Sequence, residues 1–246
     1  MRSAVSCEVK GGCDPVIRLG SRVNPTKPLA RGLRAFWHAS PAYGSARLED
    51  ACCTAPLTLG DSPAWAFDSY PCLVFDGSND YAYQASGYDS WFPAGSFTVA
   101  MECMPTDVAS NYDGYWVAED ASSFGARIIN ASTDGRFDFT VANTAAAQFD
   151  ATKTGVTQDA WHVIICRFDE VTGIVDMYVD GAAGTTSATL TGTRFAAAGF
   201  WRVARNQSNE YGAMKLHSIG VWDYAWTDVQ CMAKNAVGLI GQDLFD

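Results

Sequence analysis

The chain has 246 residues, of which 48% are apolar, 18% charged and 13% aromatic, and a chain of this length buries roughly 70–75% of its unfolded surface. This excludes wholesale disorder and a mini-scaffold that depends on disulfides. No stretch approaches the roughly 20 consecutive apolar residues of a membrane-spanning helix, and the 27 acidic against 17 basic side chains give a net charge of −10, which argues against nucleic acid or a membrane as a partner.

The N-terminal residues 1–31 are predicted to form an extended arm. Glycine and proline residues interrupt any regular element in this stretch, and the opening residues lack the apolar run of a secretory signal. The arm is Pro-rich and mildly basic, so it suits lying on an acidic surface, either that of its own domain or that of a neighbouring subunit. The residues expected to make these contacts are Arg18, Arg22, Pro25, Lys27, Pro28 and Arg31.

The rest of the chain is predicted to be a succession of short strands with little helix. Alternation of apolar and polar residues at 97–103, 136–141 and 175–179 predicts strands with one buried face and one face in water. Residues 161–166 are apolar on both faces, which indicates a central strand. Further strands are predicted at residues 32–37, 72–75, 81–84, 115–118, 126–129, 200–204 and 216–222.

Turn residues separate these strands. Asp-Gly pairs at 76–77, 134–135 and 180–181 supply the positive φ that tight hairpin turns need. About ten strands at this spacing predict an all-β fold, an antiparallel β-sandwich formed by residues 32–246.

One short helix is predicted near the C-terminus. Thr227 and Gln230 have the spacing of a capping box, and Gly238 is suited to end the helix. The helix is expected to lie as a lid on the sandwich through an apolar stripe. The stripe consists of Val229, Met232, Ala233, Ala236 and Val237.

The eight cysteines are expected to be free thiols of a protein made in a reducing cytoplasm. Cys103 and Cys166 lie inside apolar runs, where cysteine is typical of a small buried hydrophobic side chain. The lack of C-x-x-C pairs disfavours a zinc site. Pairings of Cys7 with Cys13, and of Cys72 with Cys52 or Cys53, stay open.

Three motifs in chain order resemble the laminin-G-like, concanavalin-A-like jelly rolls. Residues 73–81 (LVFDGSNDY) resemble the opening of that fold, and residues 160–181 resemble its central hairpin, with a Trp-His pair and a Val-Asp-Gly end. Residues 218–227 resemble its closing strand and helix. The resemblance covers roughly 33–240 and implies a jelly roll, a fold that hosts lectins, glycosidases, adhesion modules and virion proteins.

A narrower resemblance concerns residues 24–37 (NPTKPLARGLRAFW). They resemble the leader of laminin-G-like proteins from tailed-phage structural modules, although residues 48–59 depart from that group's pattern. The resemblance implies a non-enzymatic virion protein that is assembled in the host cytoplasm and displayed on a capsid or tail surface. Its arm and loops would attach it to other virion proteins or to sister copies in a homo-oligomer.

No catalytic residues are predicted. Glycosidases on this fold commonly carry an E-x-D-x-E strand that places paired carboxylates in the cleft, and the sequence has no such motif and no G-x-S-x-G elbow. All six glutamates are interpreted as solvated surface groups. His162, in the Trp-His pair, is expected to satisfy backbone groups. A glycosidase with an unrecognised carboxylate pair remains as a third alternative.

Oxygen-bearing side chains at two places are candidates for calcium. Asp76, Asn79 and Asp80 form the densest cluster, and calcium takes carboxylate and amide oxygens. The same residues suit an Asx turn, which is the favoured interpretation, so no cofactor is predicted except this candidate calcium. Asp107 and Asp113, with Asn111, form a second and sparser cluster.

Aromatic residues in two loops are candidates for ligand binding. Aromatic rings stack on sugar faces and also form contact centres at protein interfaces, which supports the alternative function of a carbohydrate-binding adhesin that recognises surface glycans. In a chain this rich in aromatics, some of these rings are instead expected to close the ends of the sandwich. The candidates are Tyr88, Trp91, Phe92, Tyr112, Tyr115 and Trp116.

Overall fold

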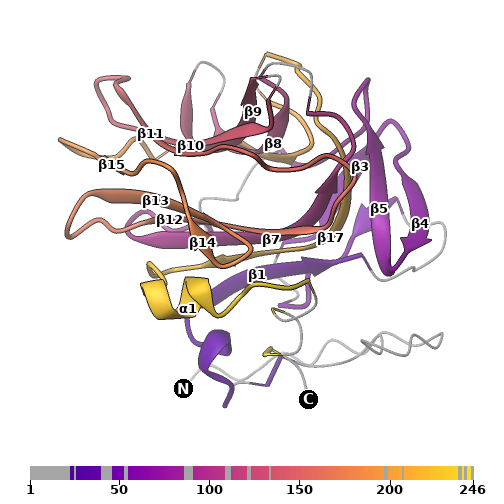
Figure 1. Ribbon diagram of the computed structural model, residues 1–246, viewed down its shortest axis with the longest axis horizontal. Coiled ribbons are helices and arrows are strands. Elements are labelled where there is room, and N and C mark those ends of the chain that lie inside the picture. Colours follow the sequence, from indigo (N-terminus) through magenta and orange to yellow (C-terminus); the bar gives the residue numbers. More distant parts are fainter. Residues whose placement is uncertain are drawn as a thin grey trace.

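The computed structural model describes residues 23–24, 26–39, 46–52, 55–85, 91–108, 112–120, 123–132, 134–196, 199–206, 208–237, 240 and 243–244. They form two antiparallel sheets that pack face to face (Figure 1). The predicted all-β sandwich is confirmed. None of the helices in the described part of the chain is long and apolar enough to cross a lipid bilayer.

The first sheet has nine strands. Its order is β14 (Ala182–Ala183), β13 (Ile174–Val179), β12 (His162–Phe168), β7 (Phe97–Pro105), β17 (Ala213–Trp222), β5 (Tyr70–Asp76) and β4 (Ala64–Asp68), with β1 (Leu33–His38) on β17 and β15 (Ala188–Thr189) on β13. The predicted central strand, β12, pairs with β7 on one side and β13 on the other.

The second sheet has eight strands. Its order is β11 (Gln148–Lys153), β10 (Arg136–Ala142), β9 (Phe124–Ser132), β8 (Gly114–Glu119), β16 (Phe200–Val203), β6 (Tyr81–Gln84), β3 (Leu57–Gly60) and β2 (Arg47–Leu48). Figure 1 shows β8 to β11 as the layer facing β7, β12 and β13.

Large aromatic rings fill the space between the sheets. Trp37 of β1 stacks on Trp201 of β16 with ring centroids 4.8 Å apart, and Trp116 of β8 lies 6.3 Å from Trp201. All three side chains are completely buried. Alternation along each strand brings these rings to the inner face, so the period-two pattern places most of this core.

The outer face of the nine-stranded sheet is covered, which corrects the expectation that its polar residues meet water. All nine residues of β7 are buried, including Thr98 and Glu102 on the outer side. The reason is that the ends of the chain lie across this face. Leu29, Trp226, Cys231, Ile240 and Leu244 from the terminal segments pack there against residues of the sheet itself, which are Phe36, Ala100, Val163, Ile165, Tyr178 and Trp222.

The N-terminal part of this cover is the 3-10 helix η1 (Pro28–Ala30). Leu29 is buried, and its carbonyl accepts a 2.6 Å hydrogen bond from Trp222 Nε1. Asn24 N donates to the carbonyl of Leu244 at 2.8 Å, so the two ends of the described chain meet. Of the predicted arm residues, Lys27 is partly exposed, and Pro28 and Arg31 are exposed. Arg18, Arg22 and Pro25 lie outside the described residues.

The C-terminal part of the cover contains helix α1 (Asp228–Met232), which Figure 1 shows on the side of β1 and β7 away from the second sheet. The predicted capping box of Thr227 and Gln230 is confirmed. The predicted apolar stripe is wrong, because Val229 and Met232 are 76% and 56% exposed and Cys231 is buried instead. A helix of five residues is too short to develop a continuous stripe.

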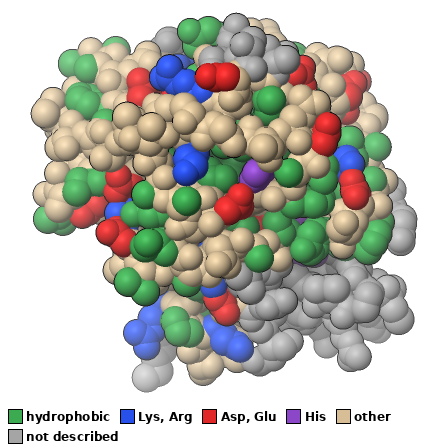
Figure 2. Space-filling view, in the orientation of Figure 1, with side chains coloured by type: hydrophobic (Ala, Val, Ile, Leu, Met, Phe, Trp, Pro, Cys, Tyr) green, Lys and Arg blue, Asp and Glu red, His purple; other side chains and the backbone are tan. Residues whose placement is uncertain are grey.

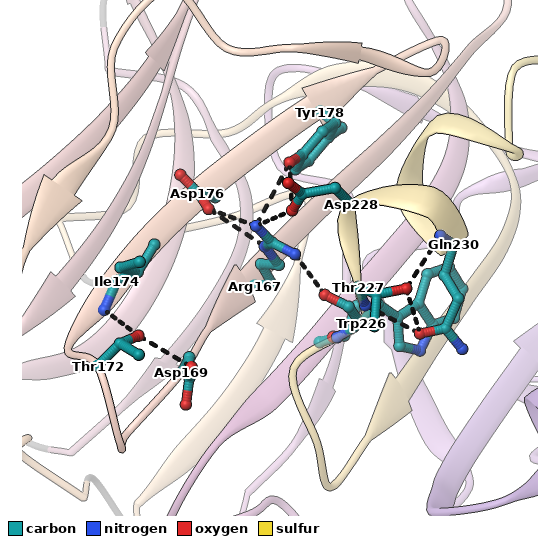
Figure 3. A network of polar contacts seen from close by, with 11 residues as sticks. Arg167, Asp169, Thr172, Ile174, Asp176, Tyr178, Trp226, Thr227, Asp228 and Gln230 are labelled. Carbon is teal, nitrogen blue, oxygen red and sulfur yellow. Dashed lines mark hydrogen bonds and ion pairs between the residues drawn. The ribbon is translucent and has the colours of Figure 1, made fainter.

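An arginine whose side chain is 13% exposed fastens α1 to the sheet (Figure 3). Arg167 of β12 donates to Asp176 Oδ2 at 2.7 Å, to Asp228 Oδ1 at 2.5 Å and to the carbonyl of Trp226 at 2.5 Å. Tyr178 Oη also donates to Asp228 Oδ1 at 3.0 Å. One guanidinium therefore joins two strands to the loop and the first turn of the helix.

The described cysteines are free thiols. Cys103 and Cys166 are buried, as predicted. The pairing of Cys72 with Cys52 or Cys53 is wrong, because Cys72 is free. Cys7, Cys13 and Cys53 lie outside the described residues.

Two histidines meet under the C-terminal cover. His38 Nε2 lies 3.3 Å from His217 Nε2, and His217 Nδ1 donates to the carbonyl of Pro71 at 2.8 Å. Burial and the neighbouring His217 ring lower the pKa of His38 to about 3. His38 is therefore neutral at physiological pH, and a proton added to it would place a poorly solvated charge against the second ring.

Replacing His38 with Gln should make the fold less sensitive to acid. Because the folded pKa of His38 lies below its unfolded value of 6.5, the unfolded chain binds more protons between these values, and stability falls as the pH drops through that window. Measured by urea unfolding at about pH 7.5 and about pH 5, the variant should lose less stability than the wild type by about 1–2 kcal/mol.

His162→Gln is the matched control with the opposite sign. Burial lowers the pKa of His162, but the hydrogen bond to Asp180 and the Thr157 carbonyl outweigh it and raise the pKa overall. His162 therefore stabilises the fold below its unfolded pKa, and this contribution is lost as the pH rises through the folded pKa. His162→Gln should be more destabilising at the lower pH. The same pH trend in both variants would contradict this account.

Candidate functional site

The aromatic residues predicted to form an exposed platform are mostly core residues. Tyr115 and Trp116 are completely buried, and Trp91 and Phe92 are 6% exposed. Tyr112 is 53% exposed, and Tyr88 lies outside the described residues. The expectation of an exposed platform is therefore wrong for these four rings.

The reason is that the loop after β6 turns its rings into one end of the sandwich. Trp91 packs edge-on against Trp37 at 5.2 Å, and its Nε1 donates to Gln84 Oε1 at 2.9 Å. Phe92 lies 5.1 Å from Phe97 of β7. These rings close the core, as the alternative interpretation stated.

The oxygen cluster at 76–80 serves a turn. Asp76 Oδ1 accepts from the backbone N–H of Ser78 at 2.8 Å and of Asn79 at 3.3 Å, and Asp80 Oδ2 accepts from Asp76 N at 3.3 Å. These are the bonds of an Asx turn. Within the described ranges, no group of three or more His, Cys, Asp or Glu side chains could hold a metal ion.

The second oxygen cluster is only partly assembled. Asp113 is 8% exposed, and burial together with the charges of Asp107 and Glu210 raises its pKa to about 6. Asn111 lies outside the described residues. Glu210 reaches this corner from the 204–212 loop, where its carboxylate accepts from the Asn206 side chain.

Two glutamates correct the expectation that all six are solvated. Glu102 is completely buried and accepts from Ser218 Oγ at 2.5 Å. Glu119 of β8 is 1% exposed and forms an ion pair with Arg202 of β16. Burial raises the pKa of Glu119 to about 7, against the lowering effect of the Arg202 and Arg205 charges. A buried, perturbed carboxylate of this kind marks a face of functional interest.

Partly exposed aromatic and arginine side chains share the outer face of the eight-stranded sheet. Ala82 points into the core, so Tyr81 and Tyr83 on either side of it point outward. Trp201 and Val203 point inward from β16, which leaves Phe200 and Arg202 on the outer face. We call these residues, with two from the loop after β16, the aromatic–arginine patch: Tyr81, Tyr83, Phe200, Arg202, Arg205 and Tyr211.

The rings and guanidiniums of the patch contact one another. Tyr81 lies 5.3 Å from Tyr83 and 6.2 Å from Tyr211, measured between ring centroids. Arg205 Cζ lies 4.6 Å above the Tyr81 ring and 5.5 Å from that of Tyr211, and Arg202 Cζ lies 4.5 Å from the Phe200 centroid. These distances are typical of cation–π contacts, so the patch is held in place before any ligand arrives.

A glycine in the neighbouring strand makes room for the central ring. Gly60 of β3 pairs with Tyr81, and a Cβ at this position would lie 2.4 Å from two carbons of the Tyr81 ring. The ring therefore lies directly on the backbone of β3. A side chain at position 60 would push it off the sheet.

The sequence carries a signal for part of this patch. The Tyr-x-Tyr and Phe-x-Arg spacings at 81–83 and 200–202 place each pair on one face of a strand, because strand side chains alternate. Both strands are predicted from the sequence, but the rings predicted to bind a ligand are those in or beside two other segments, at 88–92 and 112–116. Arg205 and Tyr211 join the patch through a short bridge between them, which no local periodicity indicates.

The model of the concanavalin A-like lectin/glucanases superfamily, described as a laminin-G-type domain, matches residues 76–230, which is more than half of the chain. The chain belongs to this superfamily. The laminin-G-like resemblance is thereby confirmed. Among curated proteins, no relative matches the sequence.

Solved structures share the superfamily fold at low identity. Domain 4 of AbnA, an extracellular arabinanase from Geobacillus stearothermophilus solved with arabinotriose, is 14% identical with a TM-score of 0.67, and the match covers 83% of this chain and 98% of that domain. The sialidase of Trypanosoma rangeli solved with sialic acid is 12% identical with a TM-score of 0.67, and the match covers 93% of this chain. This superfamily member spans about a third of the sialidase chain, 36%.

A third structure is the receptor-binding domain of botulinum neurotoxin C/D mosaic serotype. It is 9% identical with a TM-score of 0.64, and the match covers 82% of this chain and 50% of the other. At these identities the likenesses establish the fold of this superfamily member and leave its ligand to its own residues.

Replacing Trp116 with Ala should destabilise the domain. The side chain is completely buried between Phe139 and Trp201, and removal of such a ring costs about 3–5 kcal/mol. Tyr112→Ala, at an exposed aromatic in the segment just before β8, should change the free energy of unfolding by less than about 0.5 kcal/mol. Denaturant unfolding measures both, and a small loss for Trp116→Ala would contradict its burial.

Proposed function

We propose that this chain is a non-enzymatic carbohydrate-binding domain whose aromatic–arginine patch holds a glycan. The observation that carries the proposal is a set of partly exposed rings on the outer face of the eight-stranded sheet, with guanidiniums packed against them. The apolar faces of sugars stack on aromatic rings, and guanidinium N–H groups donate to sugar oxygens. The patch offers both kinds of contact over two adjoining strands, β6 and β16, and the loop after β16.

The burial and ion pairing of Glu119, the carboxyl group nearest Arg202 in the patch, favour glycan binding over glycan cleavage. A glycosidase needs two carboxyl groups that both reach the scissile bond, commonly about 5–9.5 Å apart. Glu119 is 1% exposed and paired with Arg202, so a sugar lying on the patch meets the arginine and the rings first. Glu119 thus supports the geometry of Arg202 rather than offering itself as a general acid.

The position of the chain ends supports a displayed domain. Asn24 and Leu244 meet on the outer face of the nine-stranded sheet, and the patch lies on the outer face of the other sheet. A domain fixed through its terminal side therefore presents the patch away from its support. Arabinotriose in the complex of the arabinanase domain agrees with a glycan as the ligand class on this fold.

Replacing Tyr83 or Tyr81 with Ala should weaken glycan binding by about 3–10-fold per ring, because each stacking contact is worth roughly 0.5–1.5 kcal/mol. A glycan array followed by calorimetry on the best ligand measures this. Phe67→Ala is the matched control, since Phe67 is a 75% exposed ring on β4 of the other sheet, and it should bind like the wild type.

Several outcomes would overturn the proposal. They are no binding on the array, equal binding by the tyrosine variants, or turnover of a polysaccharide by the pure protein. Binding is expected to survive EDTA, because Asp76 accepts from backbone N–H groups at the candidate calcium cluster. Loss of binding in EDTA that calcium restores would assign the ligand to that cluster instead.

A second candidate function is a virion structural protein on a phage capsid or tail surface, attached to other virion proteins through its N-terminal arm and loops. The observation that favours it is the docking of residues 26–31 on the domain by Leu29, in the segment that resembles the phage leader. Both functions are compatible with one displayed protein.

Removing residues 1–22 should separate attachment from folding. Leu29 and its bond to Trp222 remain, so the melting temperature should stay within a few degrees. Co-sedimentation with particles should fall to background if the arm attaches the domain. Retained attachment would contradict the arm hypothesis, and a large loss of stability would show that the removed residues belong to the fold.

A further inference from the structure

We infer that the aromatic–arginine patch selects glycans that carry a carboxylate, such as uronic or sialic acids, over neutral ones. The inference rests on the proposed glycan-binding function and adds the chemical class of the ligand. It is argued from the charges of the patch and from the ion-pair and hydrogen-bond partners of Arg202 and Arg205.

The first step concerns charge. The protein carries a net charge of −10, and Figure 2 shows acidic side chains at several separate places on the face in view. Against this background, burial lowers the pKa of Arg202, and the nearby charge of Arg205 lowers it further. Holding two like charges together on an acidic protein costs free energy unless an anion compensates them.

The second step concerns the partners of the two arginines. Glu119 forms an ion pair with Arg202 and balances one of the two charges. Arg205 donates through Nε and Nη2 to the side-chain oxygen of Asn209, which is a neutral amide. Within the described ranges, no carboxylate forms an ion pair with Arg205, so two arginines and one glutamate leave the patch with one positive charge.

The neighbouring basic residue does not share this excess. Arg127 of β9 lies two strands away from Arg202, because Val117 of β8 pairs with Arg202 on one side and with Arg127 on the other. The Cζ atom of Arg127 lies 4.0 Å from the centroid of the Phe124 ring. Burial lowers the pKa of Arg127, and the charges of Asp150, Glu210 and Asp138 act in the opposite direction. The uncompensated charge is therefore that of Arg205, at the end of the patch where Tyr81 and Tyr211 meet.

The third step concerns geometry. Arg205 lies over two rings, Tyr81 and Tyr211, so a sugar that stacks beside these rings brings a ring substituent to the guanidinium edge. A carboxylate accepts two parallel hydrogen bonds from arginine, and such charge-assisted pairs are roughly twice as strong as neutral ones. The amide oxygen of Asn209 holds the guanidinium until a carboxylate displaces it.

The experiment compares acidic glycans with their own neutral esters. The probes are oligogalacturonate, oligoglucuronate and sialyllactose, each beside its methyl ester, with affinity measured by calorimetry. At least one acid should bind about 10-fold or more tightly than its ester. Its affinity should fall as salt is raised, because the contact is between charges near the surface.

Three variants locate the effect. Arg205→Gln should bring acid and ester to the same affinity, Arg205→Lys should keep part of the preference, and Tyr83→Ala should weaken both forms alike. Arg34→Gln, at a half-exposed arginine on β1 of the other sheet, is the control and should keep the full preference. Circular dichroism of each variant verifies the fold.

The outcomes separate the two proposals. Equal binding of every acid and its ester overturns the inference while glycan binding stands. A preference for acids that survives Arg205→Gln also overturns it, because the charge then acts elsewhere. No binding of any probe, acidic or neutral, on the wild type overturns the inference, and the broad array then decides on glycan binding itself.

Discussion

The structure depends on burying both faces of strand β7, which lies in the middle of the nine-stranded sheet. All nine residues of β7 are removed from water, and its outward Glu102 is completely buried. An outer face of this composition cannot stand alone in solvent, because each unburied aliphatic or aromatic side chain forgoes about 1.5–3 kcal/mol. The two ends of the chain must therefore lie on it, and they do so through Leu29 and the segment that contains α1.

This cover is tied down by polar groups as well as by apolar contact. Arg167 crosses from β12 to Asp228 at the start of α1, and the backbone N–H of Ile240 donates to the buried Glu102 carboxylate. A buried charge that lost its partner would cost several kcal/mol, so the terminal segments are held in one place. The outer face of the nine-stranded sheet is consequently covered by these segments, whereas on the eight-stranded sheet the residues of the aromatic–arginine patch stay partly exposed.

The sequence predicts the strands better than their surroundings. Alternation locates β7, β10 and β13, and apolar runs locate β12, because these patterns are local. Strands β3, β4 and β11 are not predicted from the sequence. Strand β4 is a largely exposed edge strand, and β11 is rich in polar residues, so neither shows a clear alternation of apolar and polar residues. Whether an outward residue meets water is decided by segments far away in the chain, which is why Glu102 was expected to be solvated and is buried.

The dependence on distant segments also explains why only part of the aromatic–arginine patch can be predicted from the sequence. Tyr81 and Tyr83 lie on a strand that the sequence predicts, so their shared face follows from a period of two. Their contact with Tyr211 depends on the bridge between Arg205 and Tyr211, which lies between β16 and β17, two strands of different sheets. Loops were the natural place to look for exposed rings, but here the loop rings Trp91 and Phe92 close the core.

The buried pair of Glu119 and Arg202 gains its meaning from the patch. A buried ion pair is weak evidence for stability, because desolvation of both groups offsets their attraction. In this protein, burial raises the pKa of Glu119 and lowers that of Arg202, so each charge is held at a cost. What the pair does provide is a guanidinium fixed over Phe200, on the strand that pairs with β6 and its rings Tyr81 and Tyr83. Groups ordered before binding lose less entropy when a ligand arrives, so the cost is met in folding rather than in recognition.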